Sequence, residues 1–184
     1  MPYQNQKLEN YTKQADSLRK KFHSEIERLK ADETLSEIGK QQQADTLHAE
    51  TAQKLTDLRK SYKSTIDEIR QSLTDKAFKF TGTTAEKLSF DDTVFRLSRK
   101  DVKPNERLAR LQQGSPETAM AVVKSAYLAG DRKTLEGFER KHPDKVKPIA
   151  ELMDFEQQYG NNRNASTKMA ESMIFRHPTM PNFR

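Results

Sequence analysis

The sequence has no cysteine and no tryptophan in 184 residues, and only six glycines and seven prolines. Without cysteine there are no disulfides, no thiolate nucleophile and no cysteine-ligated zinc. The apolar runs are far shorter than the roughly 20 residues that cross a bilayer, so no membrane span is predicted. The opening segment MPYQNQKLENY lacks the charged-then-apolar pattern of a secretory signal. We therefore expect a protein that is used without secretion or packed into a particle.

Apolar side chains are also scarce. They make up 33% of the chain, the same share as charged residues, and the net charge is +6. Such a composition cannot bury a large core, but the regular spacing of its Leu, Ile and Phe residues separates it from disordered chains. No segment shows a convincing strand pattern, so we predict an all-α protein.

What the sequence does have is a long apolar seam in its second quarter. The seam positions are 47, 51, 55, 58, 62, 66, 69, 73, 77 and 80, and only Thr51 is polar. Steps of four, four and three form an eleven-residue repeat, which matches the pitch of an α-helix. A helix with one narrow stripe packs against another helix or another subunit. The predicted oligomer or partner seam contains Leu55, Leu58, Tyr62, Ile66, Ile69, Leu73 and Phe80.

A second stripe precedes the seam, over residues 3–30, and runs through Leu8, Tyr11, Ala15, Leu18, Phe22, Ile26 and Leu29. Residues 31–46 interrupt the pattern, and Thr34 with Glu37 fits a capping box there. Two structures are consistent with this break. Residues 3–80 form either an antiparallel helical hairpin, with Leu29 near Ile38, or one continuous helix.

Shorter helices follow the segment TGTT at 81–84. Helices are predicted over about 84–100, 104–114, 116–129, 132–142, 148–160 and 164–177, with Asp131 and Asn164 as helix caps. The division into domains is thus 1–80 for the long helices, 84–177 for a small bundle of short helices, and 178–184 for an extended C-terminal arm.

Catalytic and metal-binding patterns are missing. No two of the four histidines lie three or four residues apart, and His142 and His177 each precede a proline at a predicted helix end, where they would cap the last carbonyls. No nucleophile has an evident base, and no glycine-rich loop is present. We expect no enzyme, no cofactor and no small-molecule substrate.

The densest basic cluster lies at 96–110 and consists of Arg96, Arg99, Lys100, Lys103, Arg107 and Arg110. It is a candidate site for phosphate or for an acidic protein partner. It lacks interleaved aromatic residues and a helix-turn-helix pattern, so it points to non-specific nucleic-acid contact at most.

The arm PTMPNFR ends the chain with two prolines and two apolar side chains, Met180 and Phe183. Proline restricts the backbone, so an extended arm of this kind loses less entropy on docking than a flexible one. We expect Met180 and Phe183 to dock onto a neighbouring subunit.

The segment ERLKADETLSEIGKQQQADTLHAETAQKL, with its break at Leu35-Ser36-Glu37-Ile38-Gly39-Lys40, resembles small coiled-coil proteins from the head gene clusters of tailed bacteriophages. The stretches AMAVVKSAYLAGD and ELMDFEQQYG are of the same style. The resemblance implies a role in the virion or in its assembly, and it carries no catalytic residue.

The resulting hypothesis is a non-enzymatic phage structural protein, an oligomerising α-helical component of the virion. One alternative is a scaffolding protein that binds coat subunits in the host cytoplasm during assembly. The other is a non-specific nucleic-acid-binding protein that uses the cluster at 96–110. The expected partners are further copies of the chain or other virion proteins.

Overall fold

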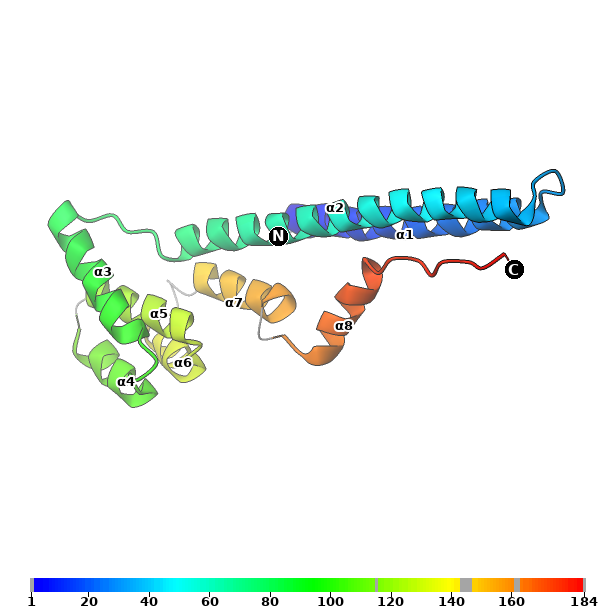
Figure 1. Cartoon of the computed structure of the whole chain (residues 1–184). Coiled ribbons are helices and arrows are strands. Elements are labelled where there is room, and N and C mark those ends of the chain that lie inside the picture. Colours follow the sequence, from blue (N-terminus) through cyan, green and yellow to red (C-terminus); the bar gives the residue numbers. More distant parts are fainter. Residues whose placement is uncertain (1, 115, 143–146, 161–162, 184) are drawn as a thin grey trace. The chain divides into compact units, whose positions relative to one another are not determined.

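The computed structural model describes residues 2–114, 116–142, 147–160 and 163–183, and all regular structure in these ranges is α-helical (Figure 1). The helices are α1 (Pro2–Ala31), α2 (Glu37–Ala77), α3 (Thr84–Ser98), α4 (Pro104–Gln113), α5 (Pro116–Ala129), α6 (Arg132–Lys141), α7 (Lys147–Tyr159) and α8 (Ala165–Ile174). The prediction of long N-terminal helices followed by shorter ones is confirmed.

The chain forms two compact units, and one of them is discontinuous in sequence. We call residues 1–70 with 157–184 the hairpin unit, and residues 71–156 the helical unit. This division differs from the one expected at 80 and 178. The last turns of α2 pack in the helical unit, whereas α8 and the C-terminal arm return to the hairpin unit.

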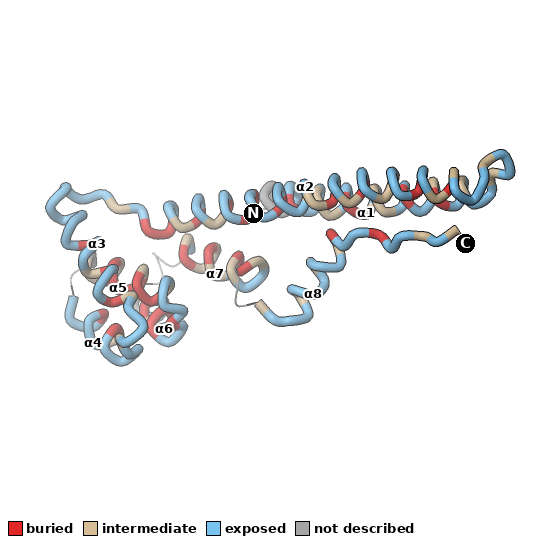
Figure 2. Tube along the Cα trace, viewed as in Figure 1, coloured by how far each residue is buried: buried red, intermediate tan, exposed pale blue. Residues whose placement is uncertain are grey.

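In the hairpin unit, α1 and α2 lie antiparallel. Contacts along their length join Lys7 to Glu68, Tyr11 to Thr65, Phe22 to His48, and Lys30 to Lys40. Residues 3–77 are therefore a hairpin and not one continuous helix. Its stripe of buried residues is visible between the two helices in Figure 2.

The turn between α1 and α2 is built differently from the expected capping box. The Asp32 carboxylate accepts hydrogen bonds from the Thr34 amide at 2.8 Å and from the Thr34 hydroxyl at 2.6 Å. Ser36 then caps α2, because its hydroxyl oxygen accepts from the Gly39 amide at 3.2 Å. The box predicted at Thr34 and Glu37 is wrong, since Asp32 engages Thr34 in a local turn before the helix begins.

The register at this end of the hairpin also differs from the expectation. Ile38, expected opposite Leu29, is 73% exposed, whereas Lys40 is buried. The Lys40 ammonium donates to the Lys30 carbonyl at 3.2 Å. A lysine can bury its aliphatic stem in this way while its charge satisfies a carbonyl at a helix C-terminus.

In the helical unit, α5 is the central helix, and α3, α4 and α6 pack on it. Its buried side chains point in several directions and are small: Ala119, Ala121, Val122, Val123, Ser125 and Ala126. A helix that is apolar around most of its circumference belongs at the centre of a bundle. Gly130 ends it with a φ of 69°. The Asp131 amide donates to the Ala126 carbonyl and the Gly130 amide to that of Tyr127, which is a Schellman motif.

Candidate interaction surfaces

Within the described part of the chain, His, Asp and Glu side chains nowhere form a group of three or more that is placed to hold a metal ion. The His142 ring, expected to cap α6, packs on the Phe138 ring at 4.8 Å between centroids, and a capping bond comes from the His142 backbone amide to the Phe138 carbonyl. A search of the described helices for one long and apolar enough to span a bilayer found none.

The seam on α2 is covered by this same chain. Leu55, Tyr62, Ile66, Ile69 and Leu73 are buried, and Leu58 and Phe80 are half-buried, in the isolated chain. In the hairpin unit, the Tyr62 ring packs on Tyr11 at 6.4 Å and on Phe175 at 5.2 Å between centroids. In the helical unit, Phe80 packs on Phe90 at 5.2 Å. The partner expected for the seam comes from α1 and from the C-terminal half, so the seam offers little surface to a second copy.

The basic cluster at 96–110 is divided by the structure. Arg96 and Arg99 are exposed but form ion pairs with Asp92 at 2.9 Å and Asp101 at 3.1 Å. Lys100, Lys103 and Arg110 are exposed on the surface. Asp92 and Asp101 reduce the positive charge of this surface, and this weakens the case for phosphate binding there.

Arg107 does not belong to any such surface, because only 3% of it is exposed. Its guanidinium donates to the carbonyls of Leu97 at 2.8 Å and Arg99 at 3.3 Å, and to the Asp131 carboxylate at 3.3 Å. Asp131 also caps α6 by accepting from the Thr134 amide and hydroxyl. Arg107 therefore ties the end of α3 to the start of α6, and its assignment as a phosphate or partner contact is corrected to a structural role.

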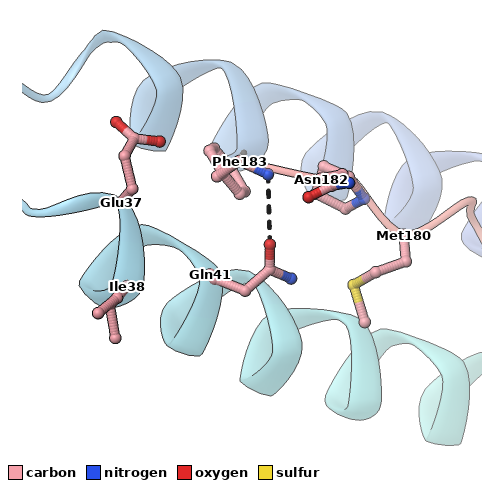
Figure 3. Close-up of a pocket in the computed structure, with 7 residues that line it drawn as sticks. Glu37, Ile38, Gln41, Met180, Asn182 and Phe183 are labelled. Atoms are coloured by element: carbon pink, nitrogen blue, oxygen red, sulfur yellow. Dashed lines mark hydrogen bonds between the residues drawn. The ribbon is translucent and has the colours of Figure 1, made fainter.

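The C-terminal arm lies along the hairpin of its own chain. Phe183 packs against the cluster formed by Phe22, Ile26 and Ala44. The Phe183 amide donates to the Gln41 side-chain oxygen at 3.3 Å, as Figure 3 shows. Met180 lies farther out and is 39% exposed. The arm was expected to dock on a neighbouring subunit. In this structure it binds the hairpin of its own chain, that is, in cis. We call the hairpin surface that it covers, which includes Phe22, Ile26, Gln41 and Ala44, the seat.

Two histidines hold the first part of the arm, and neither role was anticipated from the sequence. His48 Nε2 lies 3.0 Å from the Pro178 carbonyl and must donate to it. His177 Nε2 lies 3.1 Å from the Thr56 hydroxyl oxygen, whose own proton goes to the Ala52 carbonyl at 2.9 Å. His177 is therefore the donor as well, which makes both rings Nε2-protonated. The expected capping role of His177 is replaced by this contact with α2.

Helix α8 contacts the hairpin at its C-terminal end. Arg19 of α1 donates to the Met173 carbonyl at 2.8 Å, near the end of α8, and this carbonyl also accepts from the Arg176 amide at 3.3 Å. Arg163 and Glu171 form an ion pair beside it. Phe175, directly after the helix, is buried against Tyr62. No residue within α8 is itself buried.

Helix α3 carries an exposed apolar pair. Leu88 is 68% exposed and Phe95 is 71% exposed. They are seven residues apart and so lie on one side of the helix, opposite the buried Phe90 and Leu97. We call Leu88 and Phe95 the α3 strip.

The environment of Tyr62 makes its phenol hard to ionise. Burial, aided by the nearby Glu171 carboxylate and by Tyr159, raises the pKa of Tyr62 to about 12, although Arg163 opposes the shift. Burial also raises the pKa of Tyr159. A raised pKa means that the folded chain holds this proton more tightly than the unfolded chain, whose tyrosines titrate near 10.

We expect an alkaline loss of stability that depends on Tyr62. Its contribution is complete below pH of about 10 and disappears as the pH rises toward 12, a loss of about 2–3 kcal/mol. Urea denaturation at increasing pH, followed by circular dichroism, measures this loss. Tyr62→Phe is the control, because it keeps the ring and removes the ionisation. An equal alkaline loss in Tyr62→Phe would show that other groups are responsible.

Comparison with known proteins adds no identity: no family model, no curated protein and no solved structure matches the chain.

Proposed function

We propose that this chain is a non-enzymatic α-helical structural component of a tailed-phage particle, which acts by binding other particle proteins. The observation that carries the protein-binding part is the α3 strip, where two large apolar side chains on one side of a helix are 68% and 71% exposed. Paired apolar side chains at helical spacing are the usual anchors for a groove or a helix of another protein. The phage assignment rests on the resemblance of residues 27–55 to phage head proteins.

The charges around the α3 strip bear on the partner. Asp91 and Asp92 lie between Leu88 and Phe95 and pair with Lys87 at 3.2 Å and Arg96 at 2.9 Å. In an antiparallel pair of α3 helices with Leu88 beside Phe95, Asp91 of one copy falls opposite Asp92 of the other. Such a like-charge arrangement is unfavourable, so the preferred partner is a different protein that offers apolar side chains with a basic residue between them.

We expect the double substitution Leu88→Glu and Phe95→Glu to abolish partner binding without unfolding the helical unit, because both side chains are exposed. The control is Ala85→Glu with Ser89→Glu, two exposed positions of α3 that add the same charge outside the strip. Purified phage particles produced with tagged wild-type or variant chain are compared by quantitative mass spectrometry. Equal incorporation of the strip variant and the control would contradict the proposal.

The same particles separate the structural role from the scaffolding alternative. A structural component is present in mature particles in constant copy number. A scaffolding protein is abundant in assembly intermediates and absent from mature particles. If the chain shows that distribution, the α3 strip is a transient binding site for coat subunits.

A further inference from the structure

The seat of the C-terminal arm is made entirely of residues that any copy of this chain can offer. The groove beside it is lined by Glu37, Ile38, Gln41, Met180, Pro181, Asn182 and Phe183. Figure 3 shows the arm running along the start of α2, with the Phe183 amide facing Gln41. All the hairpin groups that hold the arm lie between Phe22 and Thr56. The hairpin of any copy can therefore bind the arm of this chain or the arm of another copy.

We propose that residues 176–183 exchange between copies, so that the arm of one chain docks in the hairpin seat of a second copy. This inference deepens the proposed function. It rests on that function only in assuming that copies of the chain are brought together in an assembling particle. In the exchanged state the His48–Pro178, Thr56–His177 and Gln41–Phe183 contacts form again with the same geometry. An exchange that reproduces every contact gives up none of their energy, which is why identical elements swap readily between protomers.

The way in which the arm is attached favours release. Its contacts with the hairpin use hairpin side chains, and the described backbone groups of 177–183 form no backbone–backbone bond with α1 or α2. Phe175 is buried against Tyr62 and stays behind as an anchor. The first contact to be exchanged is that of His177, two residues beyond this anchor, so the linker spans at most roughly 7 Å and the second hairpin must lie directly beside the first.

The cis seat also leaves apolar surface uncovered. Ile38 is 73% exposed and Met180 is 39% exposed, and both line the groove. Two hairpins that approach closely enough to exchange arms bring these side chains together. In an isolated chain, by contrast, the short tether gives the cis arm an effective concentration in the millimolar range. Exchange is therefore expected at high local concentration, as in an assembling particle.

The absence of cysteine allows a clean test with full-length chains. Gln41→Cys and Asn182→Cys are prepared as separate variants with different tags, mixed at about millimolar concentration, and treated with a short bis-maleimide. Exchange produces heterodimers in which mass spectrometry finds residue 41 linked to residue 182. The collision control pairs Asn182→Cys with Glu50→Cys, since Glu50 is exposed on the opposite side of α2 from Gln41.

We expect the 41–182 heterodimer to exceed the control and to increase with protein concentration, and Phe183→Ala in the Asn182→Cys chain to lose that excess. The chain that carries both cysteines reports the cis state by an internal link. A strong internal link with no heterodimer above the control would overturn the proposal. That result would leave binding through the α3 strip untouched, because the test uses purified protein without any other particle component.

Discussion

Arg107→Ala is expected to destabilise the helical unit by about 3–5 kcal/mol, because it leaves the buried Asp131 carboxylate without its counter-charge. The substitution also removes the donors to the Leu97 and Arg99 carbonyls at the end of α3. Whole domains are stable by only about 5–15 kcal/mol. Urea denaturation, followed by circular dichroism, should therefore show an early transition in which the helices of this unit are lost.

The matched controls come from the same basic cluster. Arg96→Ala and Arg99→Ala remove cations that are equally close to an acid but exposed to solvent. Exposed pairs of this kind contribute about 0–1 kcal/mol. If Arg107→Ala were no more destabilising than Arg96→Ala, the buried network joining α3 to α6 would not exist as described. Any salt-dependence experiment on nucleic-acid binding should leave Arg107 unchanged for the same reason.

The double substitution Ile66→Asp and Ile69→Asp is expected to unfold the hairpin unit. Both isoleucines are buried, and a charge buried without a partner costs several kcal/mol. Because the seam is covered within the chain, the melting temperature of the wild-type hairpin should not change with protein concentration in the micromolar range, well below the roughly millimolar concentrations at which arm exchange is expected. A seam shared between copies would instead give a melting temperature that rises with concentration.

Ser61→Asp with Ser64→Asp is the control for this pair. It adds two negative charges to α2 at the same spacing of three residues, but at exposed positions. Retention of the native helicity and melting temperature by Ile66→Asp/Ile69→Asp would place the seam on the surface and contradict the hairpin packing.

The local features of this fold could be predicted because they depend on neighbouring residues. Asp131 and Asn164 cap α6 and α8 as expected, with bonds from the Thr134 and Thr167 amides. The periodic seam correctly marks the side of α2 that is buried. The capping box at Thr83 and Glu86 was overlooked because the preceding TGTT segment offers several candidate start residues.

The features that depend on distant residues could not be predicted. Arg107 shares the buried side of α4 with Leu111, a spacing of four that the sequence shows, but only the nearby Asp131 makes its burial tolerable. The docking of the arm in cis joins residues more than 120 positions apart, such as His177 to Thr56. Periodicity cannot reveal which helix covers a seam, so the choice between a second copy and the same chain stays open at the level of sequence.

The discontinuity of the hairpin unit has a consequence for the order in which the chain is made. The helical unit, residues 71–156, can fold on the ribosome before the hairpin unit has received its last segment. The Arg19–Met173 and Gln41–Phe183 hydrogen bonds cannot form until the last residues have been made, because they join residues that are 154 and 142 positions apart in the sequence. During this interval of synthesis the seat on a nascent hairpin is empty. A chain just released from a neighbouring ribosome on the same messenger then offers its arm to such a nascent hairpin, so that pairing between chains can begin during translation.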